Sequence, residues 1–230
     1  MQNSHIIRDF DQAIAALRAE VLGMAAKARF NLERAVQALL ERNTELANAV
    51  IADDDDVDDA ERKIDQLGLD LLVRYHPVAT DLRLVISSMK ISMNLERISD
   101  HATNIAKRAK KMAANQELPD ATLIEPLYTL ADHLLRDAIS SYSDRNAELG
   151  ASLHARDKEL DRMYKAATAT YGGRLEQSTG RSEDYLHLIL VSRSLERVGD
   201  LATNIGEDAV FLDNARDLRH ESNRSLEQGG

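Results

Sequence analysis

Apolar residues recur along the start of the chain at alternating steps of four and three positions. The pattern begins at Phe10 and continues to Leu39. This spacing puts the apolar side chains on one stripe and predicts an α-helix about eight turns long. The polar pair Asn43-Thr44 interrupts the stripe, so we expect the helix to end just before it.

Two more helices are predicted in the first half. One apolar stripe runs from Leu46 to Leu71 and should end near Tyr75, because the residue before Pro77 is disfavoured in the helical region. Proline suits the first turn of a helix, so the next helix is expected from Pro77 to about Ala114. Three helices joined by short turns indicate one antiparallel bundle.

The pattern then begins again beyond a polar segment that contains a proline, residues 115–119. Three helices are expected in the second half, over residues 121–146, 148–171 and 182–215. Gly172-Gly173 is expected to break the chain between the last two helices. The prediction is therefore an all-α protein with two tandem units, residues 1–115 and 120–215, followed by a mobile polar tail at 216–230.

Composition narrows the class of protein. Ten Gly and three Pro in 230 residues, with 4% aromatic residues and no Trp, are typical of long helices packed through small and aliphatic side chains. A net charge of −10 argues against a nucleic-acid partner. The absence of Cys leaves only oxygen or imidazole to bind a metal. With neither a signal-peptide pattern nor about 18 consecutive apolar residues, we expect a cytoplasmic protein that is not inserted into a membrane.

A motif of eleven residues occurs in both halves at an offset of 100 positions. Residues 95–105 read LERISDHATNI and residues 195–205 read LERVGDLATNI, so eight of eleven positions are identical. Helical periodicity alone would keep apolar and polar residues at equivalent positions of the two halves, but it would not keep Glu, Arg, Asp, Thr and Asn identical. Specific chemistry or a recent duplication is required to explain the repeat.

The motif places oxygen-bearing side chains at steps of four, on one helix face. They are Glu96, Asp100 and Asn104 in the first half, and Glu196, Asp200 and Asn204 in the second. Their mean direction lies roughly opposite the apolar stripe of the same helix, so we expect them on the outside of each bundle.

A second acidic stripe lies on the preceding helix of each half. It comprises Asp54, Asp58, Glu61 and Asp65 in the first half, and Asp157 and Asp161 in the second, where Tyr164 takes the place of Glu61. Stacked like charges repel one another, so a bound cation is one reason to maintain them. Oxygen ligands favour Mg²⁺ or Mn²⁺, with iron or zinc as further candidates. The alternative is a solvated acidic face that Arg97 and Arg197 neutralise.

These residues resemble the PhoU family, whose repeated signature is a Glu/Asp-xxx-Asp motif followed by Asn. The resemblance implies two three-helix bundles related by a pseudo-twofold axis, metal clusters at the acidic motifs, and a homodimer. It also implies a negative regulator of phosphate uptake and of the phosphate regulon, an adaptor between the ATPase subunit of the phosphate ABC transporter and a sensor histidine kinase. Because the second half lacks the element Asp81-Leu82-Arg83 and carries Tyr164, the two sites are expected to differ in affinity.

Two other functions compete with this one. A carboxylate-bridged metalloenzyme of the ferritin-like type would need acidic residues inside a four-helix core and a Glu-x-x-His motif, which the sequence lacks. A metal-free helical scaffold would need no cation at all. The chain has no nucleophile elbow, P-loop or glycine-rich phosphate loop, so we expect no enzyme activity.

Overall fold

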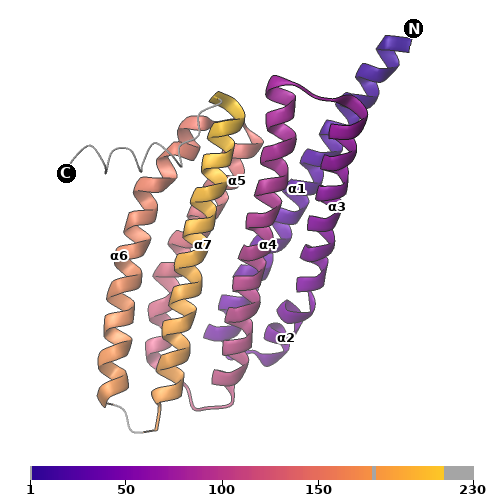
Figure 1. Cartoon of the computed structure of the whole chain (residues 1–230). Helices are drawn as coiled ribbons and strands as arrows, with labels where there is room; N and C mark the ends of the chain where they lie inside the picture. Colours follow the sequence, from indigo (N-terminus) through magenta and orange to yellow (C-terminus); the bar gives the residue numbers. More distant parts are fainter. Residues whose placement is uncertain (1, 178–179, 215–230) are drawn as a thin grey trace, which may run out of the picture.

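The computed structural model describes residues 2–177 and 180–214, and in these ranges every regular element is helical (Figure 1). The first half contains α1 (Gln2–Leu40), α2 (Thr44–Ala52), α3 (Asp54–Tyr75) and α4 (Ala79–Ala113). The second half contains the 3₁₀ helix η1 (Pro119–Ile124), α5 (Glu125–Ser143), α6 (Ala147–Gln177) and α7 (Ser182–Asn214). The predicted tail at 216–230 lies outside the described residues.

The predicted turns of the first half have identifiable causes. The side chain of Asn43 caps α2 by accepting a hydrogen bond of 3.0 Å from the backbone N–H of Leu46. The second predicted helix is divided in two at Asp53, which is the C-cap of α2 and the N-cap of α3. After α3, His76 adopts a left-handed conformation with φ 45°, and α4 begins at Ala79, two positions later than predicted.

The predicted break at Gly172-Gly173 is wrong, because α6 continues through both glycines to Gln177. A Cβ atom added at either glycine would meet nothing within 4 Å, so both positions face open space. Glycine lowers helix propensity by about 1 kcal/mol, but tertiary packing overrides that preference. Here the neighbouring Tyr171 is fully buried, and its hydroxyl donates to the carbonyl of Asp120 at 3.3 Å.

The helices form two layers. Figure 1 shows α6, α7, α4 and α3 side by side, with α5 and α1 behind them. Each half packs as a three-helix bundle, and α4 packs against α7 where the two bundles meet. Across this junction the hydroxyl groups of Ser88 and Tyr142 are 2.7 Å apart, and Arg29 pairs with Asp132 at 2.6 Å. The all-α tandem arrangement predicted from the sequence is confirmed.

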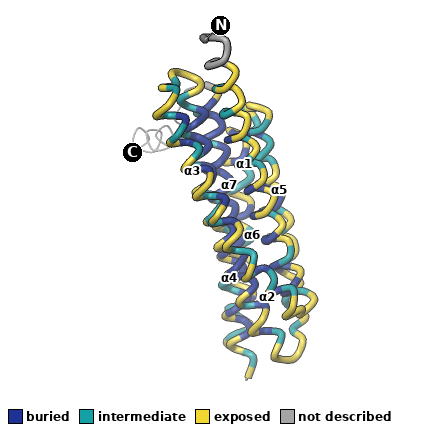
Figure 2. The backbone as a smooth tube through the Cα atoms, turned by 90° about the vertical axis from the view of Figure 1, so that its right-hand side faces the viewer, coloured by how far each residue is buried: buried dark blue, intermediate teal, exposed yellow. Residues whose placement is uncertain are grey.

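The predicted apolar stripes form the interior of the molecule. Buried positions follow the inner sides of the helices along the whole length of the molecule (Figure 2). In α4, Leu95, Ile98 and Ile105 are fully buried, and Val198 and Ile205 are their counterparts in α7. None of the helices within residues 2–177 and 180–214 is both long and apolar enough to cross a membrane.

Two glycines allow α6 and α7 to approach each other closely. A Cβ atom added at Gly150 would lie 2.6 Å from the carbonyl oxygen of Gly206, and one added at Gly206 would lie 2.9 Å from the carbonyl oxygen of Gly150. Backbone atoms cannot move aside as a flexible side chain does. This contact therefore sets the spacing between α6 and α7, the helices that carry the acidic stripes of the second half.

Replacement of Gly150 by Ala is expected to destabilise the protein by about 1–3 kcal/mol, because the added methyl group overlaps a carbonyl group of α7. Gly172→Ala is the matched control in the same helix, and it should raise stability by up to about 1 kcal/mol. Urea unfolding of the two variants measures both effects. A Gly150→Ala protein as stable as the parent would contradict the close-contact interpretation.

Candidate functional site

The first acidic cluster lies between α3 and α4. It consists of Asp54, Asp58 and Glu61 from α3 and Glu96 and Asp100 from α4. The two helices pack along their apolar stripes, and this packing brings their acidic stripes within electrostatic range of each other. Asp100 is exposed and the other members are half-buried, so the cluster lies outside the apolar core of its bundle, as predicted for the motif.

Burial and mutual repulsion perturb the first cluster. Partial burial is the main cause that raises the pKa of Glu96 from 4.5 to about 7, and Asp100 and Glu61 raise it further. Burial also raises the pKa of Asp100, with Asp54 and Asp58 as further causes. Each cause disfavours the charged carboxylate. A cation bound here would relieve the repulsion.

Ser99 orients one member of the first cluster, a role that the sequence analysis missed. Its hydroxyl donates to Asp54 Oδ1 at 3.0 Å, and it accepts a hydrogen bond of 3.5 Å from the side-chain amide of the buried Asn31. The signal was present in the repeat, because Ser99 and Gly199 occupy one of the three positions at which the motif differs between the halves.

The second acidic cluster lies between α6 and α7. It consists of Asp157 and Asp161 from α6 and Glu196 and Asp200 from α7. Burial raises the pKa of Asp157 to about 7, with Asp200, Asp161 and Glu196 as further causes. Gly199 makes room for two side chains of α6, since a Cβ atom there would overlap Leu160 Cδ2 and would lie 3.0 Å from Asp157 Oδ1.

The shared Glu-Arg pair of the motif behaves differently in the two halves. Arg197 Nη1 donates to Asp200 Oδ2 at 2.7 Å, and its Nε lies 3.4 Å from Glu196 Oε2. Arg97 makes no hydrogen bond or ion pair with any residue that the structure describes, and it lines the groove between α4 and α7. The expected local neutralisation therefore occurs in the second cluster alone.

The predicted amide ligands lie at solvent-exposed positions of α4 and α7. Asn104 and Asn204 are both exposed, and Asn204 lines the groove between α4 and α7 together with Lys90 and Arg97. Tyr164 lies close enough to Arg197 to influence its charge, and it adds no carboxylate to the second cluster. The first cluster thus has five carboxylates, and the second has four, two of which are paired with an arginine.

Within residues 2–177 and 180–214, no three Asp, Glu, His or Cys side chains converge closely enough to enclose a metal ion. The donor chemistry nevertheless suits a hard cation, because each cluster offers only oxygen atoms from half-buried or exposed side chains. A ferritin-like centre is disfavoured, since its carboxylates would project into a bundle core.

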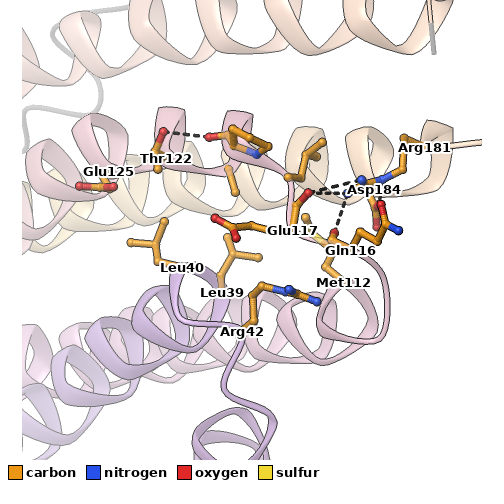
Figure 3. Close-up of a pocket in the computed structure, with 13 residues that line it drawn as sticks. Leu39, Leu40, Arg42, Met112, Gln116, Glu117, Thr122, Glu125, Arg181 and Asp184 are labelled. Carbon is orange, nitrogen blue, oxygen red and sulfur yellow. Dashed lines mark hydrogen bonds and ion pairs between the residues drawn. The ribbon is translucent and has the colours of Figure 1, made fainter.

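A separate hollow of about 180 Å³ lies beside the segment that joins the two bundles (Figure 3). Its arginines are already engaged with the backbone. Arg42 donates to the carbonyl of Ala113 at 3.0 Å, and Arg181 donates to the carbonyl of Gln116 at 2.7 Å. Arg181 Nε also donates to Asp184 Oδ2 at 2.8 Å. These contacts hold the linker in place and engage both arginines of the hollow.

The raised pKa of Glu96 predicts how stability depends on pH in the absence of metal. Between pH 4.5 and about 7, Glu96 holds its proton more strongly in the folded chain than in the unfolded chain, so its contribution to the free energy of unfolding should fall as pH rises through this range. Glu96→Gln removes one contribution to the slope and should unfold at a higher temperature than the parent at pH 8, but not at pH 5. Thermal unfolding in chelator tests this, with Glu159→Gln on the exposed side of α6 as control. Identical slopes for Glu96→Gln and the parent would refute it.

Comparison with known proteins agrees with this architecture. The PhoU domain model matches residues 21–109 and 124–209. A phosphate-specific transport system accessory protein PhoU homolog of Pseudomonas putida is 34% identical over 94% of this chain and 85% of its own length. The crystal structure of PhoU from Pseudomonas aeruginosa superimposes with a TM-score of 0.87 and 31% identity, over 90% of this chain and 100% of that one.

A second solved structure leads to the same conclusion. The phosphate transport system regulatory protein PhoU from Streptococcus pneumoniae has a TM-score of 0.83 at 25% identity, over 90% of this chain and 98% of that one. The two domain matches each include one copy of the repeated acidic motif. This chain therefore belongs to the PhoU family.

Proposed function

We propose that this chain is a regulatory accessory protein of a phosphate transport system. It restrains phosphate uptake, and with it the expression of phosphate-starvation genes, when phosphate is plentiful. The observation that carries the proposal is the match of both halves to the PhoU domain, together with relatives named as accessory proteins of phosphate-specific transport. In this role the chain acts by binding rather than by catalysis.

The proposed partners are the ATPase subunit of a phosphate ABC transporter and a sensor histidine kinase, both reached from the cytoplasm. Long rigid helices suit an adaptor, because they present extended surfaces without needing a catalytic cleft. A homodimer would double the number of such surfaces. These partner and assembly assignments follow the family resemblance.

We further propose that the two acidic clusters bind divalent cations, Mg²⁺ or Mn²⁺ in the first instance, with iron and zinc as alternatives. The support is physical: half-buried carboxylates from neighbouring helices repel one another, and two of them have a pKa raised to about 7. Bound metal would supply positive charge that offsets this repulsion. Small changes of side-chain rotamer would bring the oxygen atoms closer together.

The two clusters should differ in affinity for metal. The first cluster is expected to bind Mn²⁺ more tightly, because Arg197 competes with a cation for two carboxylates of the second. Calorimetric titration of chelator-treated protein measures this difference. Glu96→Gln should remove the tighter binding event, and the matched variant Glu196→Gln should remove the weaker one. Loss of the same event in both variants would contradict the assignment, and absence of any binding would refute the metal proposal.

The regulatory proposal is tested in cells that lack the gene and carry a reporter of phosphate-starvation transcription. Cells without the protein should express the reporter in high phosphate, and the parent chain should silence it again. The double variant Glu96→Gln/Glu196→Gln tests whether metal sites are needed for silencing, with Glu159→Gln as control. A reporter that stays silent in high phosphate without the protein would overturn the proposed function.

A further inference from the structure

The packing interface between α4 and α7 has two ends that the internal repeat relates to each other. The two helices run antiparallel, as shown by contacts that proceed in opposite directions along them. Arg83 Nε donates to the carbonyl of Leu212 at 3.3 Å, and Ser87 Oγ donates to the carbonyl of Asp208 at 3.1 Å. Because the halves are offset by 100 positions, each residue of one end has an equivalent at the other end.

The charges at the two ends are not equivalent. At one end Lys90 Nζ lies 3.8 Å from Asp208 Oδ1, so that a cation faces an anion. The equivalent positions at the other end are Leu190 and Arg108. The carboxylate has thus been replaced by a guanidinium group, and the ammonium group by an apolar side chain. This end of the interface therefore carries the cation Arg108, and position 190 offers no charged partner for it.

Arg108 has no partner for its charge among the residues that the structure describes. Its Nε is buried without a hydrogen-bond acceptor. Burial lowers the pKa of this guanidinium group, and no neighbouring carboxylate raises it. A buried N–H group without an acceptor has lost its water and gained nothing in return.

His187 is a second unsatisfied group at the same end. It is 7% exposed, and neither ring nitrogen has a hydrogen-bond partner. Burial lowers its pKa, and Arg108 and Lys111 on α4 lower it further, so these cations lie within electrostatic range of the ring. On its own helix, Glu183 Oε1 lies 3.6 Å from Nε2.

The nearest buried carboxylate is already engaged. Asp184 accepts a hydrogen bond of 2.7 Å from the side chain of Asn115 and one of 2.8 Å from Arg181. Towards the middle of the interface between α4 and α7 the potential stays positive, since Arg97, Arg197 and Arg193 all act on the half-buried His101. Arg193 is exposed and forms no ion pair with the described part of the chain. In a chain with a net charge of −10, this is a local region of positive charge.

We infer that the end of the α4–α7 interface around Arg108 and His187 binds a tetrahedral oxyanion, with inorganic phosphate as its expected ligand. A guanidinium group and a buried imidazole lie within electrostatic range of each other there, and oxyanions accept hydrogen bonds from such groups strongly. Arg108 is half-buried, so a small ion can reach its guanidinium group from solvent more readily than the backbone of a partner protein can. The choice of phosphate among oxyanions rests on the proposed function, but the anion site itself does not.

Calorimetric titration of the purified full chain with inorganic phosphate, in chelator and at constant ionic strength, tests the site. We expect saturable binding with a Kd of about 1 mM or tighter. Arg108→Gln should weaken it by about tenfold or more, since a charge-assisted hydrogen bond is lost. Lys90→Gln is the matched control, because it removes a cation from the other end of the same interface, and it should leave affinity unchanged.

Three results would overturn the inference. The first is that no saturable binding occurs up to roughly 10 mM phosphate. The second is that Arg108→Gln and the parent bind phosphate with equal affinity. The third is that an acidic peptide saturates the site but phosphate does not. Sulfate is titrated in parallel, and equal binding of sulfate supports a general oxyanion site. The two experiments are independent of each other. A failed titration of the purified protein does not contradict the reporter experiment, and derepression in cells does not contradict a measured phosphate affinity.

A measurement on the parent chain guards against a misfolded variant. Arg108 and Lys111 lower the pKa of His187, whereas Glu183 and Asp184 raise it. A bound anion would offset the effect of the two cations and add to the effect of the two carboxylates. The pKa of the His187 imidazole should therefore rise on addition of phosphate. NMR titration of the histidine ring signals, with His187→Gln for assignment, reports this shift. An unchanged His187 pKa at saturating phosphate contradicts the assigned position.

Discussion

The candidate site depends on repulsion between carboxylates. Two apolar cores hold these carboxylates side by side. The stripes that bury Leu95 and Ile98 in one bundle, and Leu195 and Val198 in the other, fix the position of each acidic helix. The carboxylates on the outer sides of these helices cannot move apart without loss of core packing. Their shared burial and charge raise the pKa of Glu96 and of Asp157 to about 7. The hydrophobic stability of the bundles thus maintains an electrostatically unfavourable surface, which a cation would neutralise.

The repeat places one motif in two different surroundings. Ser99 donates to Asp54, whereas Gly199 makes room for Asp157. Arg197 pairs with the carboxylates of its own motif, whereas Arg97 lies in the groove between the bundles. The same divergence separates the two ends of the α4–α7 interface, where Asp208 has a partner in Lys90 and its equivalent Arg108 has none among the described residues. Identical residues in a repeat therefore do not guarantee identical chemistry.

The fold and the two acidic stripes could be predicted from the sequence, because both follow from helical periodicity and from the repeat. The helix that continues through Gly172-Gly173 could not, since packing around Tyr171 outweighs the local preference of glycine. The division of the second helix at Asp53 was also missed. Which side chains face each other across helices depends on how the helices pack. That relation determines the place of Asn204 in the groove and the pairing of Arg197, neither of which a helical wheel reveals.

The central claim is that the paired acidic helices form cation sites on the outside of both bundles. Crystals of the protein grown with Mn²⁺, with diffraction data collected at the manganese absorption edge, test it most directly. The account predicts anomalous peaks between α3 and α4, beside Glu96 and Asp58, and between α6 and α7, beside Asp157 and Asp200. A map without peaks at either cluster, or with peaks only at sites remote from these carboxylates, would contradict it.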